Sequence, residues 1–140
     1  TDIVMAIREI IRMGHPTLRR VARHLEPGEL ASEEIKLLVT DMIETLHHAG
    51  GVGLAAPQVN ESIRLAIIEI PGGPSRYGEI PAMPLTVFVN PQVEVLDDEP
   101  EGYWEGCLSV PGLRRSTAME PDWQKRHWQF YRRGVIAFRT

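Results

Sequence analysis

The longest periodic pattern of apolar residues in the chain lies between residues 32 and 48. Its apolar side chains recur at three- and four-residue spacing, which places them on one face of a helix: Ile35, Leu38, Val39, Met42, Ile43 and Leu46. Ser32 stands just before the pattern as an N-cap, and two glutamates follow in the first turn, where the helix dipole favours negative charge. Gly50-Gly51 follows the last apolar position and is expected to end the helix.

The middle of the chain follows a different pattern, in which short apolar and β-branched runs alternate with loops rich in Pro and Gly. These runs predict strands at residues 64–70, 86–90, 92–96 and 103–108. Asn90-Pro91 is a turn signal between the second and third runs, so we expect those two strands to form an antiparallel pair. Four prolines and three glycines predict a loop over residues 71–84.

A helix followed by several short strands is typical of the α+β class. The length of 140 residues predicts one domain, residues 1–140, with enough chain to bury a core. The apolar run at residues 6–12 is too short to distinguish a strand from a short helix.

Cys107 is the only cysteine in the chain, so it cannot form an internal disulfide. Such a residue is buried filler, a reactive thiol or a metal ligand. Gly106 before it allows another group to approach the backbone, and Pro111-Gly112 is a turn signal just after it. This setting favours a metal ligand at the end of a short strand.

A second stretch, Gly51-Val52-Gly53-Leu54-Ala55-Ala56-Pro57-Gln58, predicts a tightly packed loop with room for a ligand. Together with Glu105-Gly106-Cys107-Leu108-Ser109 it resembles the first two signatures of the peptide deformylases, GxGLAAxQ and EGCLS. Both stretches match at every fixed position and occur in the same order, and the resemblance covers about Met5 to Arg114.

The resemblance implies a deformylase-like fold and an amide hydrolase that removes the formyl group from the N-terminal formylmethionine of nascent proteins. It implies a divalent metal of the iron, zinc or nickel type, held by the cysteine and by two histidines of a third signature, HExxH. The implied partners are N-formylmethionyl peptides or nascent chains, with the ribosome as a further partner.

Position by position, the resemblance makes Cys107 the thiolate ligand and Gln58 the amide that helps to hold the reacting oxygen. The backbone N–H of Leu108 becomes the second donor to the oxyanion. The residues that contact substrate would be Gly53, Gly106 and Arg114.

The HExxH signature is absent: none of the five histidines is followed by Glu, and none has a second His four residues on. His47 and His48 fall in the last turn of the predicted helix and read best as a C-terminal pair, while His15 beside Pro16 reads as a solvated turn residue. His127 could supply at most one of the missing ligands. We therefore expect the metal to be poorly retained and the chain to be weakly active or inactive.

The last part of the chain differs in charge from the rest. Residues 1–113 carry 8 − 17 = −9 and residues 114–140 carry 7 − 2 = +5, with five of the nine aromatic side chains in the latter segment. Three interpretations stay open: a truncated deformylase created by a frame change near Arg114, which we favour; a divergent homologue with its own short tail; or a sequence that lacks a segment.

A non-enzymatic alternative follows from the same segment. Basic residues interleaved with aromatic ones are typical of nucleic-acid contact, so a catalytically dead homologue could bind RNA or the ribosome through residues 115–140. Losing the helix that carries HExxH would leave apolar surface exposed, which predicts either self-association or a tail that folds back over the gap with Trp123, Trp128, Phe130 and Phe138. No apolar run reaches the roughly 20 residues of a membrane span, and no secretory signal is visible. With a single cysteine, this predicts the cytoplasm or an organellar matrix.

Overall fold

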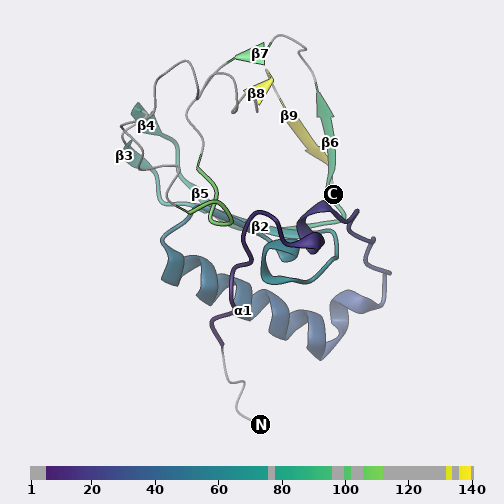
Figure 1. Cartoon of the computed structure of the whole chain (residues 1–140). Coiled ribbons are helices and arrows are strands. Elements are labelled where there is room, and N and C mark those ends of the chain that lie inside the picture. Colours follow the sequence, from purple (N-terminus) through teal and green to yellow (C-terminus); the bar gives the residue numbers. More distant parts are fainter. Residues whose placement is uncertain are drawn as a thin grey trace.

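The computed structural model describes residues 6–75, 78–95, 100–101, 106–111, 132–133 and 136–139 (Figure 1). The helical elements are η1 (Pro16–Arg19), η2 (Glu29–Ala31), α1 (Glu33–Ala49) and η3 (Ala56–Val59). The strands are β1 (Gly53–Ala55), β2 (Leu65–Ile70), β3 (Gly73–Ser75), β4 (Gly78–Ile80), β5 (Met83–Val89), β6 (Gln92–Val95), β7 (Pro100–Glu101), β8 (Arg132–Arg133) and β9 (Ile136–Arg139).

Helix α1 confirms the helix expected over residues 32–48. Ser32 caps it, with its Oγ accepting from Ile35 N at 3.3 Å. Gly50 ends it in the left-handed conformation, at φ 69°, and its N–H reaches the carbonyl oxygens of Leu46 and His47. Among the described residues, no helix is both long enough and apolar enough to cross a membrane.

The core lies between α1 and a three-stranded antiparallel sheet of order β1-β2-β5 (Figure 1). The helix contributes the buried side chains Ile35, Leu38, Met42 and Leu46. Strand β2 contributes Leu65 and Ile67, which point to the same face because they are two residues apart. Burying each such side chain stabilises the fold by about 1.5–3 kcal/mol. In the described part of the chain, the antiparallel sheet and the one long helix confirm the α+β class.

Three small two-stranded pairs lie outside this sheet: β3 with β4, β6 with β9, and β7 with β8. The prediction that residues 71–84 form only a loop is wrong, because β3, β4 and the start of β5 fall inside it. Gly73 and Pro74 lie in β3 and Gly78 lies in β4, whereas Pro71, Gly72 and Pro81 lie between strands. Strand β9 pairs with β6, so residues 136–139 lie beside residues 92–95. The tail aromatics Trp123, Trp128 and Phe130 lie outside the described residues.

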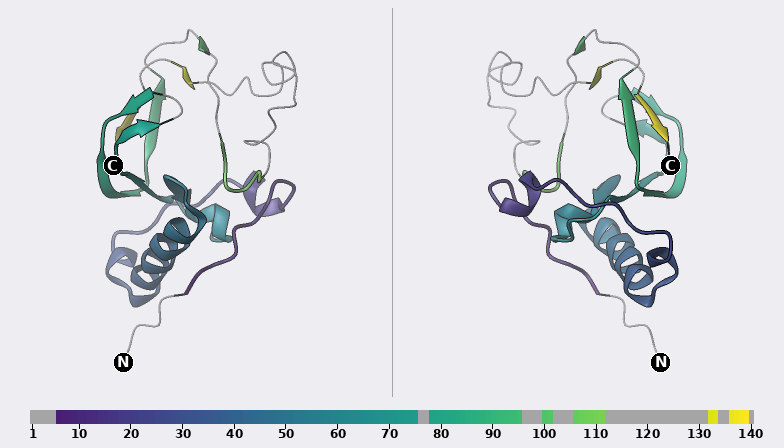
Figure 2. Two further views of the ribbon diagram at one scale, coloured as in Figure 1. Left: turned by 90° about the vertical axis from the view of Figure 1, so that its left-hand side faces the viewer. Right: turned by 90° about the vertical axis from the view of Figure 1, so that its right-hand side faces the viewer.

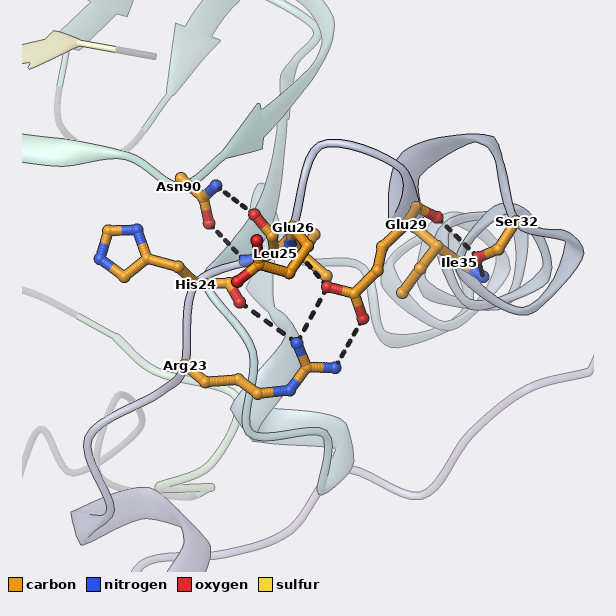
Figure 3. A network of polar contacts seen from close by, with 8 residues as sticks. All are labelled: Arg23, His24, Leu25, Glu26, Glu29, Ser32, Ile35 and Asn90. Carbon is orange, nitrogen blue, oxygen red and sulfur yellow. Dashed lines mark hydrogen bonds and ion pairs between the residues drawn. The ribbon is translucent and has the colours of Figure 1, made fainter.

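The expected pairing of the strands on either side of Asn90-Pro91 is also wrong. Strand β5 pairs with β2 and β6 pairs with β9. Asn90, at φ 49°, turns the chain, and its N–H donates to Arg64 O at the end of β2. Its side chain binds both backbone polar atoms of Leu25, as Figure 3 shows. These bonds hold the turn against the loop before α1, so β6 leaves the sheet instead of folding back on β5.

The same loop is closed by an ion pair between Arg23 and Glu29, at 2.9 Å (Figure 3). Glu29 also accepts from Glu26 N at 2.6 Å, and its own carbonyl accepts from the Ser32 hydroxyl. The Arg23 guanidinium and the Glu26 N–H lower the pKa of Glu29 to about 2. The ion pair and these hydrogen bonds therefore link the loop, through Glu29, to Ser32 at the N-terminus of α1.

The N-terminal residues 6–12 form neither of the two elements expected for them, a strand or a short helix. Two of their backbone N–H groups bind side chains of α1 instead: Ala6 N donates to Asp41 Oδ1 at 2.9 Å, and Arg8 N donates to Thr45 Oγ1 at 2.8 Å. The Arg8 side chain also pairs with Asp41, which is 4% exposed. Because these backbone N–H groups bind side chains and not the backbone of a neighbouring strand, the segment is held against α1 without forming regular secondary structure.

Candidate functional site

The first arm of the site is the segment from β1 to η3. Gly53 and Ala55 of β1 pair with Ile68 and Ala66 of β2, and the chain then turns into the short helix η3. Gln58 is the third residue of η3, and its Oε1 accepts from Ala55 N at 2.9 Å. A Gln at this position that reaches back to the residue before the helix is half of a capping box. The local structure thus fixes the direction of the Gln58 amide.

The second arm is the turn at residues 106–111, which Val110 N closes by donating to Cys107 O at 3.0 Å. Cys107 is exposed, whereas Ser109 is buried at 4% exposure. Leu108 packs against the core, next to Gly51, which lies just before β1. The strand expected over residues 103–108 is not found where it can be checked: residues 106–107 belong to no strand and residues 108–109 form a turn, while 102–105 lie outside the described residues. The bond from Val110 N back to Cys107 O shapes this turn.

The two arms meet at the Gln58 side chain. Its Nε2 lies 3.1 Å from Ser109 Oγ and 3.7 Å from Cys107 Sγ. The resemblance assigns Gln58 and Cys107 to one site, and the structure brings their side chains together although the two residues are 49 positions apart in the chain. Their chemical roles stay predictions.

The N-terminal segment at residues 11–13 binds the backbone of both arms. Ile11 N donates to Gln58 O and Met13 N donates to Ser109 O, each at 2.8 Å. In both views of Figure 2 residues 106–111, in green, lie beside the purple N-terminal segment. Neighbouring backbone groups thus set the separation of the two arms.

The remaining residues expected in the site are placed less closely. Gly53 lies in β1, where an added Cβ would meet only β2 atoms, at 3.5 Å or more. Gly106 is exposed beside Cys107. Within the described part of the chain no acceptor takes the Leu108 backbone N–H, which leaves it able to serve as a donor. Arg114 lies outside the described residues.

Ser109 is the site residue that sequence reasoning missed. It is the last fixed position of the EGCLS signature, and a small hydroxyl residue two positions after a candidate ligand was the available signal. Its importance depends on burial and on the contact with Gln58, neither of which shows in the sequence.

The donor set of the described residues does not fit a three-ligand metal site. Among them, no three His, Cys, Asp or Glu side chains gather closely enough to hold an ion. His47 bonds Glu69 Oε1 through Nε2 at 2.7 Å, which adds a side-chain partner to its expected position at the helix end. His15 Nδ1 accepts from Thr17 N. His127 lies outside the described residues, so Cys107 is the one expected ligand that the structure places.

Comparison with protein families gives a match between residues 7–126 and the family described as polypeptide deformylase. This match continues beyond Arg114, where the resemblance read from the sequence was expected to end. A peptide deformylase of Leptospira biflexa is 40% identical over 110 residues, covering 79% of this chain and 62% of that protein. Peptide deformylase 1 of Xanthomonas campestris is 51% identical over 108 residues, covering 77% of this chain and 61% of that protein. The chain therefore spans less than two thirds of the length of these relatives.

Solved structures agree with the sequence comparisons. A class I type b peptide deformylase from Acinetobacter baumannii, with Met-Ala-Ser bound, matches with a TM-score of 0.66 at 33% identity. That match covers 76% of this chain and 67% of the other. The peptide deformylase of Thermotoga maritima matches with a TM-score of 0.61 at 34% identity, covering 76% of this chain and 63% of the other.

Proposed function

Because this chain belongs to the polypeptide deformylase family, we propose that it recognises the N-formylmethionyl end of peptides or nascent chains, the substrate of a metal-dependent amide hydrolase. The single observation that carries the proposal is the meeting of the Gln58 amide and the Cys107 thiol, 3.7 Å apart, on an exposed turn. The Acinetobacter relative that binds Met-Ala-Ser supports a peptide with an N-terminal methionine as the ligand.

Two donors would bind the formyl oxygen. One is Gln58 Nε2 and the other is the backbone N–H of Leu108, which has no acceptor among the described residues. Donors held in place before a reaction stabilise the charge that develops on a carbonyl oxygen. Gly53 and Gly106 would offer backbone to the peptide, and Arg114 would line its path.

Cys107 would be the thiolate ligand of the divalent metal that the family uses. We infer that this chain retains the metal poorly and turns over weakly or not at all, since HExxH is absent from its sequence. A catalytic metal site needs about three protein ligands with one open position. The missing glutamate would also remove general-base assistance, which is typically worth ~10²–10⁴-fold in rate.

The test uses the full 140-residue chain. Metal content is measured after purification, hydrolysis of N-formyl-Met-Ala-Ser is followed by formate release, and binding of the formylated and unformylated peptides is compared by calorimetry. We expect substoichiometric metal, little or no formate release, and preferential binding of the formylated peptide. Cys107→Ala separates effects of the thiol from effects of the donors.

Two results would overturn parts of the proposal. Stoichiometric metal with turnover abolished by Cys107→Ala would show a complete and active site. Equal affinity for the two peptides would remove the proposed recognition of the formyl group. Reading the coding DNA past the codon for Arg114 in all three frames tests the frame change, because an HExxH sequence in another frame would support it.

A binding role with RNA is the second candidate, supported by the +5 charge of residues 114–140. It predicts a complex with single-stranded RNA that weakens steeply with salt, because phosphate contacts release counterions. Affinity that does not change with salt would contradict it. Self-association also stays a prediction, and sedimentation at several protein concentrations measures it.

A further inference from the structure

We propose that Ser109 is a positioning residue for Gln58. Its hydroxyl binds one hydrogen of Nε2 and thereby directs the other hydrogen to the space beside Cys107. The identity of the ligand oxygen that takes this second hydrogen rests on the proposed function. The positioning itself rests only on the contacts of Gln58.

The orientation of the Gln58 amide follows from its partners. Ala55 N–H can only donate, so the atom that faces it must be the carbonyl oxygen Oε1. Nε2 then lies on the other side of the amide, towards residues 107–109. Rotating the amide by 180° would place two donors against each other at Ala55, whereas the Ser109 hydroxyl, which can donate or accept, would tolerate either orientation, so the Ala55 contact fixes the assignment.

The two hydrogens of Nε2 are not equivalent. Ser109 Oγ, at 3.1 Å, is an ordinary hydrogen-bond acceptor. Cys107 Sγ, at 3.7 Å, is a weak one. The hydrogen towards Cys107 is therefore the one that a carbonyl oxygen of a ligand can take without breaking a strong bond.

The surroundings make this arrangement rigid. Ser109 is 4% exposed, so water does not compete for its hydroxyl. Ile11 N and Met13 N donate to the backbone carbonyl oxygens of Gln58 and Ser109, so one N-terminal segment holds the backbone of both residues. A donor that is already oriented loses less entropy when a ligand binds.

The first test needs no substitution. Side-chain amide exchange is measured by NMR on the ¹⁵N-labelled 140-residue chain. The two Gln58 Nε2 hydrogens should exchange at different rates, with one protected at least about tenfold over the other. Gln92, which is exposed on β6, is the internal reference, and its two hydrogens should exchange alike. Equal exchange at Gln58 would overturn the proposal.

The second test uses matched serine variants. Ser109→Ala should remove the protection and weaken binding of N-formyl-Met-Ala-Ser by about tenfold, the effect expected of one well-oriented hydrogen bond. Ser109→Thr keeps the hydroxyl and should restore protection. Ser62→Ala is the control, because Ser62 Oγ is buried without a hydrogen-bond partner among the described residues, so neither measurement should change.

The outcomes separate the two proposals. If protection is lost in Ser109→Ala but the wild-type chain does not distinguish formylated from unformylated peptide, the positioning stands and the proposed function fails. If Ser109→Ala folds and keeps the protected hydrogen, Ser109 does not position Gln58, whatever the peptide result. If Ser109→Ala does not fold, the exchange measurement on the wild-type chain decides.

Discussion

Gly51 lies against the side chain of Leu108, so closely that a Cβ added to Gly51 would be 2.9 Å from Leu108 Cδ1 and 3.3 Å from Leu46 Cδ1. Gly51 precedes β1, and Leu108 belongs to the turn that carries Cys107. The absence of a side chain at one position thus lets the two arms of the site approach each other.

Gly51→Ala is therefore expected to push the Leu108 side chain away from the core. Overpacking of this kind costs about 1–3 kcal/mol, and the low end applies because the first contact is the flexible end of a leucine. Urea denaturation measures the loss, and the Gln58 amide exchange should change with it. Gly28→Ala is the control: its φ is −80° and nothing lies within 4 Å of an added Cβ. That variant should stay within about 1 kcal/mol of the wild type, on the stabilising side.

Asn90→Gly tests the contact between Asn90 and Leu25. Glycine tolerates the φ of 49° but removes the bonds to Leu25 N at 2.8 Å and to Leu25 O at 2.9 Å. Leu25 is 4% exposed, so its backbone groups would lose buried partners. We expect a loss of about 1–3 kcal/mol in the free energy of unfolding. Asn90→Asp keeps only the acceptor for Leu25 N, so its free energy of unfolding should lie between those of the wild type and Asn90→Gly. If Asn90→Gly unfolds like the wild type, the contact with Leu25 does not stabilise the fold.

Thr45→Val tests the docking of the N-terminal segment on α1. Thr45 is 1% exposed, and its hydroxyl accepts from Arg8 N and donates to Asp41 O. Valine has a similar shape but leaves the Arg8 N–H without this acceptor, so we expect about 1–3 kcal/mol of destabilisation. Thr40→Val is the matched control, because its hydroxyl donates only to Lys36 O on the exposed face. Equal effects of the two substitutions in chemical denaturation would show that the Arg8 contact contributes nothing.

The ion pair of Glu29 predicts a pH dependence of stability. The Arg23 side chain has the largest effect and the Glu26 N–H the next largest, and together they lower the pKa of Glu29 from its ordinary 4.5 to about 2 in the folded chain. Between these values the unfolded state binds more protons than the folded state, so this contribution is present above pH 4.5 and is lost as the pH falls towards 2. Arg23→Gln should reduce the difference in melting temperature between about pH 5 and about pH 2.5. Lys36→Gln removes an exposed pair with Glu33 and should leave the slope unchanged.

The local patterns of the sequence determined α1 almost completely. Ser32, the apolar spacing and Gly50 act within a few residues of one another, so the cap, the buried face and the end of the helix could all be predicted. The buried strand β2 followed from its β-branched run in the same way. The two signatures identified the family and named Gln58 and Cys107, because those residues are recognisable by their neighbours in the chain.

Pairing and contacts across the chain were decided by the tertiary structure. The turn at Asn90 is held by hydrogen bonds to Leu25, 65 residues away, and no local period encodes that contact. The irregular N-terminal segment depends on acceptors that α1 supplies. The role proposed for Ser109 depends on its burial and on a contact with Gln58, 51 residues away. Local propensity acts over a few residues, whereas burial and hydrogen bonding are properties of atoms that meet only after the chain has folded.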